Sequence, residues 1–167
     1  MGRRVDAGGR VAAWSACGLG LGSAAVSAYW ALGGTALLDT IGGQLEEWGR
    51  DRSAVVVALL AAVAVVKAGV AVAAVVATGV VRAPRWAAGR VPRALSWAAA
   101  LVLIAYGGVL TAAGLLVEVG VIEPGRDADR HALAWHTWLW DPWFLLWGVA
   151  FAMALVGSRR SRADRAS

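Results

Sequence analysis

The chain has 167 residues, a formal net charge of +5 at pH 7 and a mean hydropathy of +0.63. With glycine counted and tyrosine left out, about 70% of its residues are apolar, whereas soluble domains contain about 45–50%. A water-soluble globule of this length could not bury so much apolar surface. Cys17 is the only cysteine, which excludes a disulfide scaffold and dithiol redox chemistry. The composition therefore predicts a polytopic membrane protein.

Four unbroken apolar stretches are long enough to cross a bilayer. They cover residues 11–33, 54–81, 94–122 and 138–157. Inside hydrocarbon every backbone amide and carbonyl group must be hydrogen-bonded within the chain, and stretches without an alternating polar pattern achieve this only as helices. The predicted fold class is all-α, a compact bundle of four membrane-spanning helices in one domain, residues 1–167.

Basic residues predict the orientation of the spans. Of the 16 basic residues, 11 lie in the N-terminal tail, the loop 82–93 and the C-terminal tail. Short loops rich in Arg and Lys stay in the cytoplasm, so we expect both termini to be cytoplasmic and the loop 82–93 to contact anionic lipid headgroups. No nucleic-acid partner is expected, because the basic residues follow the membrane topology. A signal peptide cleaved after Val26-Ser27-Ala28 is an alternative account of the first span.

The first outer loop, residues 35–52, has the spacing of an amphipathic helix in the headgroup plane. Its apolar positions are Leu37, Leu38, Ile41, Leu45 and Trp48. We expect Gly42-Gly43 to break or bend this helix.

The second outer loop is predicted to turn at Glu123-Pro124-Gly125 and to continue into a short helix capped by Asp127. Asp141-Pro142 has the pattern of a further helix start, with aspartate as the cap and proline at the first helical position. These signals predict where the fourth span begins.

Aromatic residues gather at the outer end of the bundle. They are Tyr29, Trp30, Trp48, Trp135, Trp138, Trp140, Trp143 and Trp147. Indole rings favour the membrane–water interface, which predicts an aromatic belt. The alternative is an aromatic-lined pocket for a flat or cationic ligand.

Lys67 is the single lysine and the only cation inside an apolar span. A charge at that depth costs at least about 2.5 kcal/mol, so it usually faces the bundle interior and has a partner. Counting from the cytoplasmic arginine of each span places Lys67, Asp141, Ser27, Tyr106 and Thr111 within about 8 Å of one another in depth. We therefore predict an intramembrane polar cluster of these five residues, with Lys67 and Asp141 as its charged members. The alternative is structural: Lys67 extends toward the headgroups, and Asp141 only caps a helix.

His131 and His136 lie near several outer acidic residues, which raises the question of an external metal site. A spacing of five does not place both histidines on one α-helical face, and no metal-binding motif accompanies them. The pattern favours a solvated acidic loop. Both histidines lie on the same side of the membrane, which disfavours a haem held between facing helices. No phosphate-binding loop or Ser-His-Asp set occurs, so we expect no metal and no cofactor.

Small residues recur at a spacing of three or four along the first three spans, which allows helices to approach closely. They include Gly18, Gly22, Gly69, Ala73, Ala77, Gly107, Thr111 and Gly114. This predicts close helix packing, and any such face left uncovered could bind a second copy or a partner membrane protein.

The segment Tyr29-Trp30-Ala31-Leu32-Gly33-Gly34, with Asp141-Pro142, resembles a bacterial family of small four-helix integral membrane proteins of unknown function, frequent in actinobacteria. The excess of Arg over Lys and of Ala, Val and Gly is similar to that of high-GC genomes. The resemblance implies four spans in the bacterial cytoplasmic (plasma) membrane and brings no activity or cofactor. It marks Tyr29, Trp30, Gly33, Gly34 and Asp141 as residues of interest.

Three functions fit these observations. The first is a non-enzymatic accessory or structural helix bundle that acts through lateral contacts. The second is a small transporter or ligand-binding protein with an outward-facing polar cavity around Lys67 and Asp141. The third is an enzyme acting on a lipid or a quinone-like molecule, which would depend on Lys67, Asp141 and the tyrosines alone.

Overall fold

The computed structural model describes residues 6–125 and 128–163, which contain helices and no strand. Four helices are long and apolar enough to cross a membrane, so the all-α prediction is confirmed. They are α1 (Ala7–Ala31), α3 (Ala54–Ala77), α4 (Arg90–Glu118) and a continuous fourth helix made of α5 (Arg130–Trp135), the π-helical turn η3 (His136–Trp140) and α6 (Asp141–Ala163). Three short elements, η1 (Leu38–Thr40), α2 (Gly43–Asp51) and η2 (Arg85–Ala88), lie between them.

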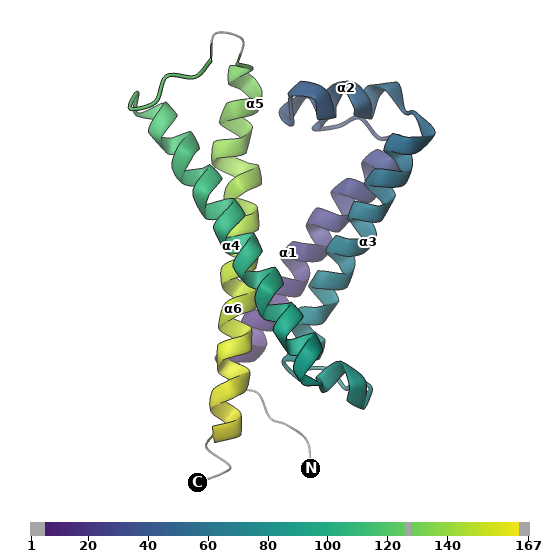
Figure 1. Ribbon diagram of the computed structural model, residues 1–167, viewed down its shortest axis with the longest axis vertical. Helices are drawn as coiled ribbons and strands as arrows, with labels where there is room; N and C mark the ends of the chain where they lie inside the picture. Colours follow the sequence, from purple (N-terminus) through teal and green to yellow (C-terminus); the bar gives the residue numbers. More distant parts are fainter. Residues whose placement is uncertain (1–5, 126–127, 164–167) are drawn as a thin grey trace.

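The four long helices form two packed pairs that cross and then diverge (Figure 1). α1 packs against α3, and α4 packs against α6; the pairs are joined mainly by α1 against α6, whereas α3 and α4 touch little. The start of α1 and the end of α6 lie at one end of the molecule, called here the terminal end (Figure 1). α2 and residues 119–125, which follow α4, lie at the opposite end, called here the α2 end, where the pairs are farthest apart.

The hydrophobic core lies where the pairs cross, nearer the terminal end. α6 contributes its large fully buried side chains, Trp147, Phe151 and Leu155. These pack against alanines of the other helices, Ala16, Ala71, Ala74 and Ala100. Small residues opposite large ones bring the backbones close enough for dispersion contacts, which are the main attraction between helices in lipid. Arg93 adds a polar tie at this end, because its guanidinium donates to Leu155 O at 2.9 Å and to Ser158 Oγ at 3.0 Å.

Glycines on α4 and α6 confirm the prediction of close helix packing. A Cβ at Gly107 would overlap the backbone of Leu145, and one at Gly114 would overlap the side chain of Thr137. Gly18 and Gly69 differ, since a Cβ there would meet no atom within 4 Å. The small residues of α4 therefore face a neighbouring helix, whereas Gly69 of α3 faces an uncovered surface.

The fourth helix begins at Arg130 and not at Asp141-Pro142, so the predicted helix start at Asp141-Pro142 is wrong. Asp129 caps the helix, its Oδ1 accepting from His131 N at 2.9 Å and Ala132 N at 3.1 Å. Asp127, the predicted cap, lies outside the described residues. Pro142 has no amide to bond to the carbonyl four residues earlier. The helix continues because the turn before it is π-helical, with Asp141 N bonded to His136 O.

The first connection at the α2 end contains two short helices and not one continuous amphipathic helix. The predicted break is confirmed, because Gly42 and Gly43 take positive φ values of 66° and 60°, a conformation that favours glycine. Leu38 is only 2% exposed and lies beneath Gly49 of α2. Trp48 remains exposed. The segment therefore folds back over the open end of the bundle.

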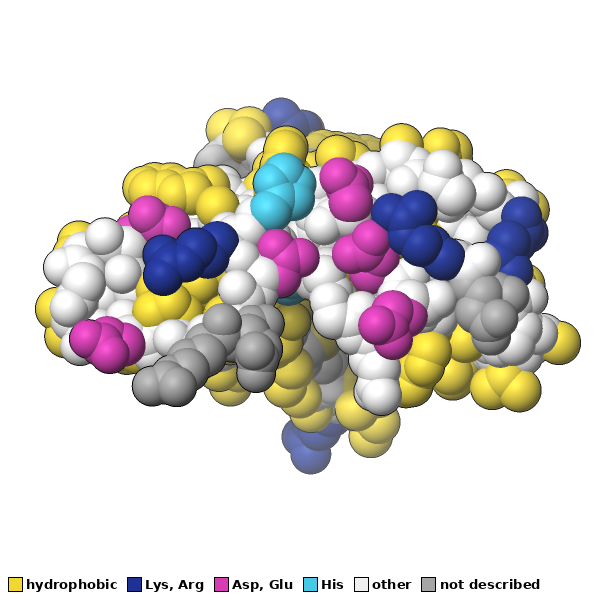
Figure 2. Space-filling model, turned by 90° about the horizontal axis from the view of Figure 1, so that it is seen from above, with side chains coloured by type: hydrophobic (Ala, Val, Ile, Leu, Met, Phe, Trp, Pro, Cys, Tyr) yellow, Lys and Arg dark blue, Asp and Glu magenta, His cyan; other side chains and the backbone are white. Residues whose placement is uncertain are grey.

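Charged side chains mark the α2 end of the molecule. Figure 2 shows acidic side chains gathered on this face together with basic side chains and a histidine, and hydrophobic side chains around the rim. The pairs include Arg50 with Glu46 at 2.8 Å and His131 with Asp39 at 3.7 Å. A polar end above apolar sides is the surface expected of a chain whose sides face lipid.

Candidate functional site

A cavity of about 400 Å³ opens between the diverging helix pairs at the α2 end. This volume falls in the range of small-molecule sites. Its walls are mostly apolar, with η1 and α2 supplying Leu38, Ile41 and Trp48 and α3 supplying Val56, Leu59, Leu60 and Val63. Its polar or aromatic lining includes Ser27, Trp30, Lys67, Tyr106, His136, Trp140 and Phe144. Residues from every long helix therefore meet in this one space.

Lys67 is the cation of the cavity. Its Nζ donates to Ser27 Oγ on α1 at 3.0 Å and lies 5.3 Å from the centroid of the Phe144 ring on α6. An ammonium group has three N–H donors, and Ser27 accepts one of them. Among residues 6–125 and 128–163, no other acceptor is hydrogen-bonded to Nζ and no carboxylate lies within 4.0 Å of it. Two donors are therefore left for a molecule in the cavity.

Asp141 does not contact Lys67, although the sequence places the two at similar depth. Its carboxylate is buried, and Oδ1 lies 3.3 Å from His136 Nδ1. In a π-helical turn residues five apart share a face, so η3 brings His136 and Asp141 together. Counting residues along the spans gives depth but not rotation about the helix axis, and the π turn changes that rotation just before Asp141.

The other predicted cluster residues divide between the cavity and the packed interior. Tyr106 lines the cavity with its ring edge against Phe144, the centroids being 5.5 Å apart at 88°. Thr111 does not line it, and its buried hydroxyl has no hydrogen-bond partner in the described part of the chain. The structure thus brings together Lys67, Ser27 and Tyr106. The use of this cluster for function remains a prediction.

The segment from Tyr29 to Gly34, which carries the family resemblance and is called here the family-like motif, forms the end of α1 and the turn after it. Trp30 Nε1 donates to Ala36 O at 2.9 Å, and Tyr29 Oη accepts from Ala36 N at 3.4 Å. Gly33 has a φ of 99°, and a Cβ at Gly34 would overlap the Tyr29 ring. Side chains larger than hydrogen are therefore excluded at both glycines, which explains the paired glycines of the motif. The resulting tight turn presents Trp30 to the cavity.

Phe144 is the site residue that sequence reasoning missed, whereas Trp140 was considered only among the outer aromatic residues and His136 only for an external metal site. Trp140 Nε1 donates to the buried Thr40 Oγ1 at 3.0 Å, and its ring lies 5.8 Å from that of Trp30. His136 Nε2 lies 3.3 Å from Ile41 O. These contacts tie η3 to the segment that covers the cavity. The signal in the sequence was the His-to-Asp spacing of five followed by proline, which suits a π turn.

The outer aromatic residues lie in two settings, and each setting suits one of the two predicted roles. Trp30, Trp48 and Trp140 line the cavity, whereas Trp138 is 67% exposed on the outer surface, as in an interfacial belt. Around His131 and His136, as in the rest of the described chain, no three His, Cys, Asp or Glu side chains form a group that could hold a metal ion.

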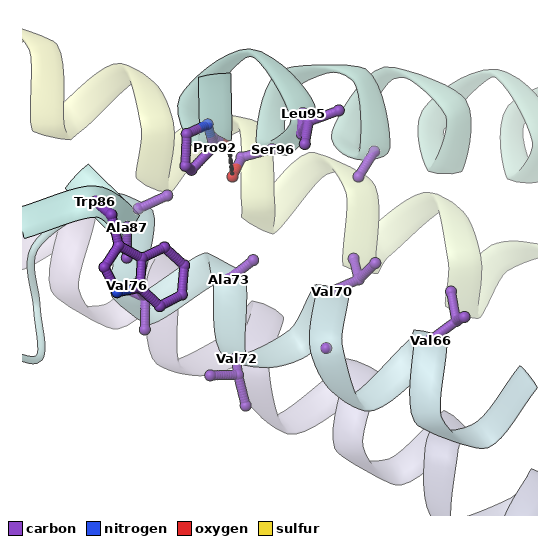
Figure 3. Close-up of a pocket in the computed structure, with 13 residues that line it drawn as sticks. Val66, Val70, Val72, Ala73, Val76, Trp86, Ala87, Pro92, Leu95 and Ser96 are labelled. Atoms are coloured by element: carbon purple, nitrogen blue, oxygen red, sulfur yellow. Dashed lines mark hydrogen bonds between the residues drawn. The ribbon is translucent and has the colours of Figure 1, made fainter. Parts of the chain in front are cut away.

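A second hollow of about 470 Å³ lies between α3 and α4 on the side of the molecule (Figure 3). Val70, Ala73 and Val76 of α3 line it opposite Leu95 and Ser96 of α4. Ser96 Oγ donates to Pro92 O at 2.8 Å, as the dashed line shows. The described side chains that line this groove are uncharged, so the groove offers a surface for packing against another apolar group.

These features define a multi-pass, all-helical membrane protein with a cavity between its helix pairs. The chain belongs to the family described as "Protein of unknown function (DUF3995)", whose model matches residues 20–151. That match includes the motif at the end of α1, the whole of α3 and α4, and the cavity residues named above. Comparison with curated proteins and with solved structures finds no match for the chain.

Proposed function

We propose that this protein is a non-enzymatic, ligand-binding membrane protein whose cavity takes an apolar molecule with a polar group beside Lys67. The observation that carries the proposal is the Lys67 ammonium, which lies in an apolar cavity and has only Ser27 as a described hydrogen-bond acceptor. A cation inside a membrane costs at least about 2.5 kcal/mol. A ligand that accepts its remaining donors would offset that cost.

The arrangement of the other polar groups supports binding in preference to catalysis. His136 faces Asp141 through Nδ1 and Ile41 O through Nε2. An acid–base catalyst or an activated nucleophile requires such a group to be within hydrogen-bond reach of the substrate or nucleophile. Here both ring nitrogens of His136 lie beside protein groups, Asp141 Oδ1 and Ile41 O, and not beside the open space of the cavity. The pair supports the wall and the covering segment of a binding site.

The proposal places the protein in the bacterial cytoplasmic membrane with both termini in the cytoplasm, so that the cavity lies toward the outer face. Two observations support this orientation. The start of α1 and the end of α6 lie at the same end (Figure 1), and the arginine-rich loop 82–93 connects α3 to α4 at that end. Arginine in short loops favours the cytoplasmic side and anionic headgroups.

The test is a thermal-unfolding screen of the full chain in phosphatidylcholine nanodiscs with a fatty acid, a fatty alcohol, a quinone and a cationic amphiphile. Val63→Trp fills the cavity, and Val65→Trp is its control, because Val65 is 71% exposed and does not line the cavity. A ligand at about 100 times its Kd adds about 2.7 kcal/mol to the free energy of unfolding. We expect at least one compound to stabilise the wild type and the control but not Val63→Trp. The proposal is contradicted if no compound stabilises any of the three proteins, or if each compound that binds stabilises the wild type, Val63→Trp and Val65→Trp equally.

A second function, a structural bundle that associates with its own copies, is favoured by the groove of Figure 3. Gly69 lines this groove, and a Cβ there would meet no atom within 4 Å. Gly69→Leu would fill the groove, and Gly18→Leu on α1 is the matched control, because Gly18 is equally open but does not line it. We expect energy transfer between differently labelled copies to fall for Gly69→Leu alone. Equal transfer in both variants contradicts self-association through this groove.

A further inference from the structure

The geometry points to a specific ligand class for the cavity: a single-chain amphiphile with one carboxylate, bound with that carboxylate beside Lys67. This inference rests on the proposed ligand-binding function and names its ligand. It follows from the charge of the cavity, from the hydrogen-bond donors around Lys67 and from the apolar wall of α3.

The charge of the cavity favours a single negative charge. Among the described residues that line it, Lys67 is the one Lys or Arg. Asp141 is buried against His136 and does not line the cavity. A carboxylate carries one charge and neutralises the ammonium, whereas a phosphate monoester carries about −1.5 to −2 at neutral pH and would leave excess charge in apolar surroundings.

The donors around Lys67 suit the two oxygens of a carboxylate. Two N–H groups of the ammonium are not taken up by the described residues. Ser27 Oγ accepts from Lys67, which leaves the proton of the hydroxyl able to donate. Tyr106 of α4 lines the same cavity and carries a phenolic group that can donate a hydrogen bond. Hydrogen bonds to an ionised group are roughly twice as strong as neutral ones, so these donors favour an anion over an alcohol or a ketone.

The wall beyond Lys67 suits an alkyl chain. Along α3 the cavity is lined by Val56, Leu59, Leu60 and Val63 before it reaches Lys67. At 1.5 Å per residue this wall extends about 16 Å along the helix axis. Trp30, Trp48 and Phe144 complete an apolar surface around it. A chain of medium length therefore fits along α3 with its carboxylate at the Lys67 end.

The experiment measures binding of tritiated laurate to the full chain in phosphatidylcholine nanodiscs, at a pH at which laurate is ionised. Dodecyl phosphate, dodecanol and dodecyltrimethylammonium, which share its chain length, compete against it. The variants are Lys67→Met, Lys67→Arg and Ser27→Ala. Arg82→Met is the control, because it removes a positive charge from an exposed residue that does not line the cavity.

We expect laurate to bind the wild type and Arg82→Met equally, and Lys67→Met about tenfold more weakly, which corresponds to one charge-assisted hydrogen bond. Lys67→Arg should retain most of the affinity. Dodecanol should compete at least about tenfold less well than laurate and should be indifferent to Lys67→Met. If Lys67→Met does not fold, Ser27→Ala should still weaken laurate but not dodecanol.

Three outcomes would overturn the inference. If dodecanol competes as well as laurate and neither responds to Lys67, the cavity binds chains but does not select an anion. If dodecyl phosphate or dodecyltrimethylammonium competes best, the charge preference is wrong while ligand binding stands. If no compound competes and laurate binds only in proportion to the lipid, both this inference and the proposed function fail.

Discussion

At the scale of single residues, Lys67 and Asp141, the two charged side chains predicted to pair, have different partners. Lys67 pairs with Ser27 across α3 and α1, and Asp141 pairs with His136 within the fourth helix. Because Lys67 and Asp141 each have a nearby hydrogen-bond partner, neither depends on a contact with the other. This separation leaves Lys67 facing the cavity and keeps Asp141 buried against His136, outside the cavity lining.

Double-mutant cycles test this separation through thermal unfolding in detergent. Asp141→Asn and His136→Gln should couple by about 1 kcal/mol, because the two side chains are in contact. Asp141→Asn and Lys67→Met should be additive within about 0.5 kcal/mol, since no direct contact links them. Lys67→Met with Ser27→Ala is the positive control within the cavity. Strong coupling between Lys67 and Asp141 would show that they interact in the membrane and contradict the geometry.

The contacts among these residues could be predicted in part from the sequence. Counting from the flanking arginines placed Lys67, Ser27 and Tyr106 at one depth, and they do line one cavity. The same count could not predict the partner of Asp141, because depth carries no information on rotation about the helix axis. That rotation depends on a local π turn, which directly precedes Pro142 and lies where α6 packs closely against Gly107 of α4.

At the scale of elements, the fourth helix is positioned by its contact with α4. The backbone of α6 approaches so closely that a Cβ at Gly107 would lie 2.7 Å from Asp141 O and would overlap Leu145 N. One residue further along, a Cβ at Gly108 would meet only Leu145 Cδ1 at 3.7 Å, which is ordinary contact. Of these two adjacent glycines, only Gly107 is required for the close approach of α4 and α6.

Gly107→Ala and Gly108→Ala form a matched test of this contact. Gly107→Ala should lower the free energy of unfolding by about 1–3 kcal/mol, because the backbone atoms it meets cannot move aside without shifting the helix. Each kcal/mol corresponds to about 2–4 °C in Tm for a chain of this size. Gly108→Ala should be neutral or slightly stabilising, since alanine is the better helix former. Equal melting temperatures would show that the pair is packed more loosely than described.

The elements at the α2 end show the limit of periodicity as a predictor. The apolar spacing of residues 37–48 predicted one surface helix, whereas the chain forms η1 and α2 around the glycine pair. The break itself was predictable from Gly42-Gly43. The burial of Leu38 and the bond from Trp140 to Thr40 were not, because the first depends on how η1 folds beneath Gly49 of α2 and the second joins residues 100 positions apart.

At the scale of the whole molecule, α1 joins the two helix pairs. It packs against α3 and against α6, and its Ala13 and Ala16 are fully buried. Removing α1 would expose the core side chains of α6 and open the cavity wall that carries Ser27. We therefore expect the first span to be retained in the folded protein, in preference to the signal-peptide alternative. The four long apolar stretches predicted the number of spans, but the diverging arrangement arises from which helix faces carry the small residues.

The orientation of the molecule decides from which side a ligand reaches the cavity. The test uses a Cys17→Ala background, single-cysteine replacements and a membrane-impermeant maleimide. Asp39→Cys, at an exposed position on the α2 end, should be labelled in intact cells, because the arginine-poor loops are translocated. Arg82→Cys, near the terminal end, should be labelled only after the cells are opened. The reverse pattern would place the cavity on the cytoplasmic side, and Lys67 would then meet its ligand from the interior of the cell.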